Sequence, residues 1–186
     1  MKDTAQRNFT DPDSRILKTA DGFVQGYNAQ IAVDAGHQII VAWHLNAHSA
    51  DAPQLPGMLE RIKQNTGRQT HELSADAGYC PEHNLKTLKR HHIRGYVATG
   101  RVRHGAAGAE IRSRSPSVQA MHRKLRQGGW KSRYRLRKQV VEPVFGQIKH
   151  GRGFRQFLLR GLRKVQGEWS LICTAHNLLK LKTAMS

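Results

Sequence analysis

The sequence predicts an α/β fold in which a sheet carries helices on both of its faces. Two β-rich stretches, near 23–33 and 37–45, come first, and strand-like and helix-like segments then alternate along the chain. Antiparallel strands followed by strand–helix alternation are typical of such a sheet. The chain has 186 residues, enough to bury a core in one domain, so we expect a single domain over 1–186.

The first third of the chain contains a turn, a hairpin and a helix. Residues 1–22 are polar, and Asp11-Pro12-Asp13-Ser14 is their clearest turn signal. The two β-rich stretches flank Asp34-Ala35-Gly36, whose turn chemistry predicts an antiparallel hairpin. A helix is expected over 51–66, where apolar residues recur at helical spacing: Leu55, Met58, Leu59 and Ile62.

The remaining elements alternate until a basic segment interrupts them. A strand through 71–77 should end near Asp76, and a helix over 81–91, with Leu85 and Leu88 on its buried side, should precede a strand at 94–99. Residues 100–133 are rich in Gly, Arg and Ser and predict a flexible basic insertion. Helices are expected over 134–150 and 161–183, the latter with one mostly apolar side: Leu162, Val165, Trp169, Ile172, Cys173, His176, Leu179 and Lys180.

The charge of the chain points to a polyanionic partner. Lys and Arg number 31 against 13 acidic residues, which gives a formal net charge of +18. Nucleic acid is the usual polyanion for so basic a domain, ahead of a membrane surface. Cys80 and Cys173 form no Cys-x-x-Cys pair, and no apolar run approaches the roughly 18 residues of a membrane span. We therefore expect a cytoplasmic protein with no membrane partner.

Two carboxylates are candidates for metal chemistry. Asp76 follows an apolar strand, where open α/β sheets gather ligands, although a turn aspartate is the plainer interpretation. Glu142 shares one side of the expected helix with Lys138 and Lys149, and the plainer interpretation there is a solvated charged stripe. A basic chain that keeps acids among its cations can hold Mg²⁺, which binds both carboxylate and phosphate oxygens.

Three segments carry a family resemblance. The chain resembles the C-terminal two-thirds of DDE-type transposases of bacterial insertion sequences. The matching segments, in the order of the family, are NFTDPDSRILKTADGFVQGYNAQIAVD, LSADAGYC and RKQVVEPVFGQIKHGRGFRQFLLRGLRKVQGEWSLICTAHNLLKL. The resemblance implies an RNase H-like mixed sheet flanked by helices and Mg²⁺ or Mn²⁺ as cofactor. It implies double-stranded DNA, at transposon ends and target, as partner, and a homo-oligomer when active. It matches Asp76 to the second metal-binding Asp, Glu142 to the family's Glu, and Lys149 to a basic residue close to the DNA.

The sequence departs from the family around Glu142. Family members carry a basic residue, usually Arg, four positions before the Glu and Tyr seven before it. Here Lys138 takes the first position and Arg135 the second, with Tyr134 displaced by one residue. Lys provides a point charge in place of a planar fork, so the DNA contact implied for Lys138 would have altered geometry.

The family's first Asp, in an Asp-Gly-Thr type motif, has no counterpart before Asn8. Asp21-Gly22-Phe23 lies in a segment that follows the first strand in family members, and Asp11 and Asp13 are better interpreted as turn residues. We therefore expect an N-terminally truncated domain with impaired catalysis. Loss of a central strand would expose unpaired backbone groups and predicts marginal stability or oligomerisation.

Basic residues after Glu142 predict a DNA-binding track. The plainer alternative is a solvated helical face, but the charge of the whole chain favours a phosphate track with steep salt dependence. Its members are Arg152, Arg155, Arg160, Arg163 and Lys164.

Other conspicuous residues receive plainer interpretations. His71, His91 and His92 lack the tight spacing of zinc ligands. Trp169 and Phe154 are expected in the core, whereas Trp130 lies in the basic insertion and could stack on a base.

The leading hypothesis is metal-dependent phosphodiester cleavage and strand transfer at transposon ends by Asp76 and Glu142. The alternatives are a non-catalytic DNA-binding transposase remnant and a basic RNA-binding protein. The absence of the first Asp is the feature that separates the first two.

Overall fold

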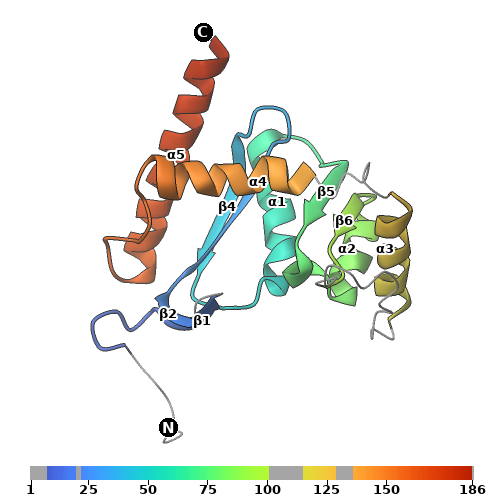
Figure 1. The fold of residues 1–186 in the computed structure, drawn as a ribbon, viewed down its shortest axis with the longest axis horizontal. Coiled ribbons are helices and arrows are strands. Elements are labelled where there is room, and N and C mark those ends of the chain that lie inside the picture. Colours follow the sequence, from blue (N-terminus) through green and yellow to red (C-terminus); the bar gives the residue numbers. More distant parts are fainter. Residues whose placement is uncertain (1–7, 20–21, 101–114, 129–135, 186) are drawn as a thin grey trace, which may run out of the picture. The chain divides into compact units, whose positions relative to one another are not determined.

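The computed structural model describes residues 8–19, 22–100, 115–128 and 136–185 (Figure 1). Two compact units emerge: one comprises Met1–Ser49 with Pro143–Ser186, and the other Ala50–Glu142. The division falls inside helix α4, Leu136–Gly146. Both units contain strands and helices, which confirms the mixed α/β class.

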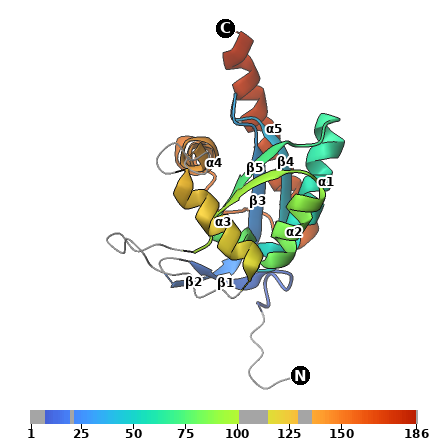
Figure 2. The same ribbon diagram turned by 90° about the vertical axis from the view of Figure 1, so that its right-hand side faces the viewer.

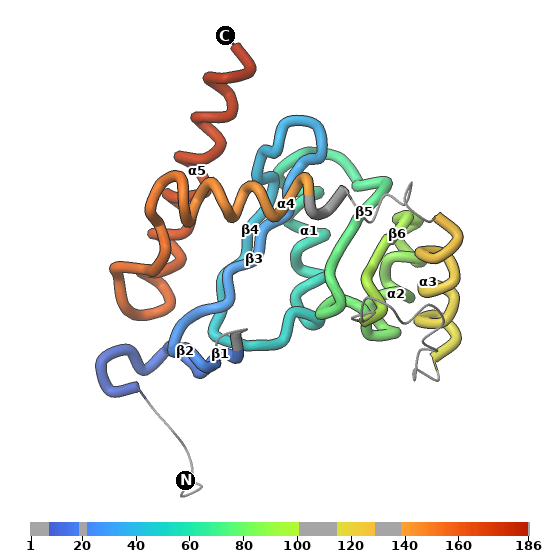
Figure 3. Tube along the Cα trace, in the orientation of Figure 1, coloured from blue at the N-terminus to red at the C-terminus, as the bar shows by residue number. Residues whose placement is uncertain are grey.

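The unit formed by the two chain ends contains two antiparallel strand pairs, β1–β2 and β3–β4. Figure 3 traces the long hairpin of β3 and β4. The end of α4, a π-helical segment and α5 complete this unit. The bounds are β1 Arg15–Thr19, β2 Gly22–Gly26, β3 Asn28–Val33, β4 Ile40–Asn46, the π-helical segment Gln147–Gly151 and α5 Leu162–Met185.

The turn of the β3–β4 hairpin is where the sequence places it. Oδ2 of Asp34 accepts hydrogen bonds from the N–H groups of Gly36, at 3.0 Å, and His37, at 2.7 Å. This side-chain turn is the reason that Asp suits the position. Gln38 adopts a left-handed conformation, with φ of 59°, and its N–H donates to the Asp34 carbonyl at 3.1 Å.

Helix α5 packs on β4 and covers the apolar side of the hairpin (Figure 1). Trp169 lies at the centre of this contact, 4% exposed, with the Phe145 ring stacked beside it and the Phe157 ring edge-on. The buried residues of this core are Ile40, Leu45, Val144, Ile148, Val165, Trp169, Ile172 and Cys173. Five of the residues predicted for the apolar side of α5 are buried, whereas Leu179 is half exposed.

The unit Ala50–Glu142 is built around one parallel strand pair, β5–β6. Helices α2 and α3 lie side by side and both contact β6 (Figure 2). The bounds are η1 Ala52–Gln54, α1 Leu55–Thr66, β5 Glu72–Ala75, η2 Ala77–Tyr79, α2 Glu82–Arg90, β6 Arg94–Val97 and α3 Pro116–Gln127.

The core of this second unit confirms the helical periodicity seen in the sequence. All four predicted residues of α1 are buried, as are Leu85 and Leu88 of α2. These helices meet β6 through Val97, which is fully buried. The core comprises Leu55, Leu59, Cys80, Leu85, Leu88, Ile93, Val97 and Val118.

Four expectations from the sequence are wrong in detail. The polar segment 1–22 contains β1, and the stretch 23–33 divides into β2 and β3 at Tyr27. The expected single sheet appears, over the described residues, as three two-stranded sheets. Phe154, expected in the core, is 41% exposed.

The segment 100–133 also differs from a uniform flexible insertion, because it includes the regular helix α3. Val118 of α3 is buried in the second core, and the Lys124 ammonium donates to the Gly95 carbonyl at 2.8 Å. One buried apolar residue and a half-buried cation are too sparse a pattern to be recognised by periodicity. Residues 101–114 and 129–135, including Trp130, lie outside the described part of the chain.

Helix α4 does not continue as an α-helix over the whole of the expected 134–150. It begins at Leu136, and a π-helical segment follows from Gln147 to Gly151. Pro143 lies inside α4 and cannot donate a backbone hydrogen bond. Val144 and Ile148, four residues apart, are both buried.

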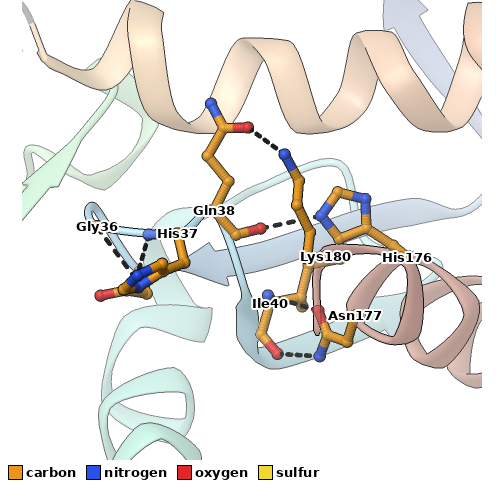
Figure 4. Close-up of polar contacts among 8 residues, drawn as sticks. Gly36, His37, Gln38, Ile40, His176, Asn177 and Lys180 are labelled. Atoms are coloured by element: carbon orange, nitrogen blue, oxygen red, sulfur yellow. Dashed lines mark hydrogen bonds and ion pairs between the residues drawn. The ribbon is translucent and has the colours of Figure 1, made fainter. Parts of the chain in front are cut away.

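A polar network ties α5 to the hairpin turn (Figure 4). His176 is fully buried, and its Nε2 lies 2.9 Å from the Gln38 carbonyl oxygen. Nη1 of Arg152 donates to Nδ1 of the same ring at 3.0 Å, so Nε2 carries the proton and donates to Gln38. Lys180 donates to the Gln38 side chain at 2.7 Å, and Asn177 bonds both backbone groups of Ile40 at 2.8 Å. The network holds Gln38 in its left-handed conformation.

This environment disfavours a charged His176. Burial lowers its pKa below the ordinary value, and the charges of Arg152 and Lys180 act in the same direction, while the hydrogen bond with Gln38 opposes them. The unfolded chain therefore binds more protons than the folded one in the range where this histidine titrates, so stability falls as pH falls.

We expect the free energy of unfolding to decrease as pH drops from about 7 to about 5, with His176 contributing up to about 1.4 kcal/mol per pH unit. The His176→Gln variant should show a shallower dependence, measured by urea unfolding followed through tryptophan fluorescence. His91→Gln, which changes an exposed histidine, is the control. Equal pH dependence in the wild type and His176→Gln would contradict the prediction.

Candidate functional site

Asp76 leaves the sheet at the carboxyl end of a parallel strand pair. β5 and β6 are in register from Glu72 opposite Arg94 to Ala75 opposite Val97. The N–H of Ala98 donates to the Ala75 carbonyl at 3.1 Å, so pairing persists to the last residue before Asp76. Oδ1 of Asp76 then accepts the Gly78 N–H at 3.0 Å and caps the short helix η2. The predicted position at a strand exit is confirmed, and so is the plainer interpretation as a turn aspartate.

A second carboxylate, Asp51, lies against the same turn. A Cβ built on Gly78 would come within 2.5 Å of Oδ2 of Asp51 and 3.2 Å of Oδ1 of Asp76. The two carboxylates therefore approach the same backbone position from residues 25 apart in sequence. Both side chains are half-buried, which leaves them access to solvent.

The Tyr79 ring reports the same concentration of negative charge. Its pKa is raised, first by burial and then by the nearby charges of Asp51 and Asp76. The phenol therefore stays protonated. Burial also raises the pKa of the Cys80 thiol, which argues against a thiolate nucleophile at this position.

Glu142 belongs to the same unit as Asp51 and Asp76. It lies on α4, immediately before Pro143, and its side chain is exposed while Val144 on the same helix is fully buried. The amphipathic arrangement expected around Glu142 is thus present. The side chain of Lys138 lies outside the described residues, although its backbone is in α4.

Lys149 is exposed on the π-helical segment that follows α4. Its ammonium lies over the Phe145 ring, 5.6 Å from the centroid. The seven-residue spacing from Glu142 does not run through an uninterrupted α-helix, because the π-helical turn contains more residues than an α-helical one. The shared side predicted for these two residues from their spacing therefore stays a prediction.

The predicted phosphate track separates into two kinds of residue. Arg155 and Arg160 are exposed and lie on the connection into α5; the other exposed members are Arg163 and Lys164. Arg152 is half-buried and directs Nη1 to His176. Its hydrogen bond to His176 therefore gives Arg152 a structural role that the sequence did not reveal.

Asp11 and Asp13 lie in the predicted turn, where the Ser14 N–H donates to the Asp11 carbonyl at 3.1 Å, but their carboxylates bond the start of α5. Oδ1 of Asp11 accepts the Gly161 N–H at 3.2 Å and the Tyr27 hydroxyl at 2.7 Å. Oδ2 of Asp13 accepts the Leu162 N–H at 2.9 Å. Both carboxylates thus satisfy N–H groups where α5 begins.

Histidines and cysteines supply no metal site in the described ranges. There, no three His, Cys, Asp or Glu side chains form a group able to hold a metal ion. His71, His91 and His92 are exposed, in agreement with their interpretation as surface residues. None of the described helices is long and apolar enough to cross a membrane.

Comparison with known proteins assigns the family. The profile of the transposase DDE domain matches residues 5–178, nearly the whole chain. The chain belongs to the transposase DDE domain family. No curated protein and no solved structure matches it. The resemblance seen in the sequence is therefore confirmed at the level of the family, and with it a role in DNA transposition.

Sequence reasoning missed Asp51 and Asn84 at the candidate site. Asp51 precedes a helix and looks like an ordinary helix-start residue, so only the tertiary structure reveals its neighbour Asp76. Asn84 carried a signal, because it falls four residues before Leu88 on the apolar side of α2. A polar residue at a buried helical position indicates a specific hydrogen-bonding role.

Gly78→Ala tests the close approach of Asp51 to the Asp76 turn. The added methyl group would lie 2.5 Å from Oδ2 and 3.2 Å from Cβ of Asp51, so the Asp51 side chain must shift. Because Gly78 is exposed, we expect a loss of about 1 kcal/mol in the free energy of unfolding, the lower end for overpacking. Gly57→Ala is the matched control, since a methyl group added at this position in α1 would meet nothing within 4 Å, and it should stabilise by up to about 1 kcal/mol. Urea unfolding measures both. Stability unchanged in Gly78→Ala would show that this approach is not constrained.

Proposed function

We propose that this transposase domain cleaves and joins DNA at transposon ends, with a divalent cation held by Asp76 and Glu142. The observation that carries the proposal is the position of Asp76 at the carboxyl end of the β5–β6 pair, within a chain of the DDE family. Ligands of open α/β sheets bind at that edge.

The two carboxylates at the Asp76 turn are of the kind that a hard cation takes. Mg²⁺ and Mn²⁺ prefer carboxylate oxygens, and Asp76 and Asp51 both direct carboxylates towards Gly78. A bound ion would activate the attacking oxygen and stabilise the leaving oxygen of the phosphodiester. Glu142, exposed on α4, is assigned as a further ligand by the family resemblance.

We assign the DNA contacts to the basic side chains after Glu142. Lys149, Arg155 and Arg160 are exposed, and the chain carries a net charge of +18. Phosphate groups would bind these cations without sequence selectivity. Arg152 would contribute its remaining guanidinium donors, and Lys138 is assigned by the family resemblance alone.

Other expectations stay predictions. They are the absence of a counterpart to the family's first Asp, homo-oligomerisation when active, and a cytoplasmic location. The missing counterpart of the first Asp favours the alternative function, a non-catalytic DNA-binding remnant. The cleavage experiment separates the two functions.

The chain should nick duplex DNA that carries the inverted repeats flanking its gene, in Mg²⁺ or Mn²⁺ and not in EDTA. Asp76→Ala and Glu142→Ala should each reduce the nicking rate by at least about 100-fold, because each removes a metal ligand. Glu60→Ala, which alters an exposed acid of α1, is the control. Cleavage that survives both substitutions would refute the catalytic assignment. DNA binding without cleavage in the wild type would establish the non-catalytic alternative.

The basic residues are tested by the salt dependence of DNA affinity. Replacing both Arg155 and Arg160 with Gln should lower the slope of log K against log salt concentration by up to about 2, since each phosphate contact contributes about 0.9. Fluorescence anisotropy with a labelled duplex measures the slope. The control changes the same charge elsewhere, at the exposed residues Lys63 and Arg90. Equal slopes for the two double variants would exclude a specific track.

A further inference from the structure

Asn84 is a fully buried amide beside the candidate metal site. It lies in the first half of α2, and its side chain is 0% exposed. Nδ2 donates to the Ala52 carbonyl at 2.9 Å and to the Tyr79 carbonyl at 3.2 Å. One side chain thus bonds two backbone segments that are 27 residues apart in sequence.

The two carbonyls belong to the segments that carry the two carboxylates. Ala52 directly follows Asp51, and Tyr79 ends the short helix that Asp76 caps. A side chain that holds both carbonyls sets the separation of the two segments. The two segments lie close together. A Cβ atom built on Gly78 would be 2.5 Å from Oδ2 and 3.2 Å from Cβ of Asp51.

The apolar surroundings of Asn84 would favour an apolar side chain if stability of the fold were the only requirement. Its neighbours Leu85 and Leu88 are buried in the apolar core of this unit. Oδ1 of Asn84 is buried with no hydrogen-bond partner among the described residues. Burying an amide oxygen without a partner is unfavourable, so the sequence accepts a cost in order to keep the two donor contacts.

We propose that Asn84 is a positioning residue for the metal site. It holds the Asp51 segment against the Asp76 turn and so fixes the positions of the two carboxylates. The inference rests on the proposed metal-dependent function. Asn84 contacts neither metal nor DNA in this role. It acts through the backbone of Ala52 and Tyr79, as residues behind metal ligands commonly do.

The test is direct binding of Mn²⁺, which needs no DNA and no turnover. Electron paramagnetic resonance of free Mn²⁺ gives the dissociation constant, and loss of the Gly78 amide signal in an NMR titration locates the ion. Asn84→Leu removes both donors at similar volume, and it should weaken Mn²⁺ binding by about 10- to 100-fold.

The matched control is Asn177→Leu, in the other unit. Asn177 also bridges distant backbone, with both hydrogen bonds to Ile40 at 2.8 Å. Its loss should destabilise the fold and leave Mn²⁺ affinity unchanged. If Asn84→Leu fails to fold, Asn84→Ser retains one short donor that cannot span both carbonyls. It should show a smaller loss of affinity in the same direction.

The outcomes distinguish the positioning role from the metal site. Wild-type affinity in a folded Asn84 variant, or equal losses in the Asn84 and Asn177 variants, would overturn the positioning role while leaving the metal site intact. Absence of Mn²⁺ binding in the wild type would refute the metal site itself, and with it any positioning role.

Discussion

Parallel pairing of β5 with β6 directs both strands to end at one edge, and the chain of each must turn away from the sheet there. Because hydrogen bonding continues up to Ala75, the backbone of Asp76 is placed by the sheet and not by a loose loop. The Asp76 side chain then shapes its own turn by accepting the Gly78 N–H. A polar turn beside a rigid strand is a suitable place for a carboxylate that must stay accessible and hold its direction.

The same turn is held from the outside by α2 and by the segment before α1. Asn84 bonds the backbone after Asp51 and the backbone at Tyr79, while the apolar residues beside it pack into the core. Two carboxylates, Asp51 and Asp76, lie at this turn, and after burial their charges are the next causes that raise the pKa of Tyr79. In a chain with a net charge of +18, carboxylates gathered at one point are a local exception that a cation would neutralise.

In the unit formed by the chain ends, polar side chains of α5 hold the β3–β4 hairpin in place. His176, Lys180 and Asn177 of α5 reach the β3–β4 hairpin and fix its turn and its first β4 residue. Arg152 completes this network through its hydrogen bond to His176. A residue that the sequence suggests for DNA binding therefore also has a structural role. Arg155 and Arg160 follow Arg152 in the sequence and are exposed. They have been given no structural role, and their side chains are suited to bind phosphate groups.

The sequence by itself determined the family, the order of most elements and the buried sides of α1, α2 and α5, because helical periodicity is local and strong in those segments. It located Asp76 at a strand exit and the hairpin turn at Asp34. It could not reveal β1, a five-residue strand with only two apolar residues, Ile16 and Leu17, nor α3, of which only Val118 is buried. Only the tertiary structure decided that Asp51 meets Asp76, that Asn84 joins their segments, and that Arg152 serves His176. These are contacts between residues distant along the chain, and no local pattern encodes which of many possible partners a side chain will reach.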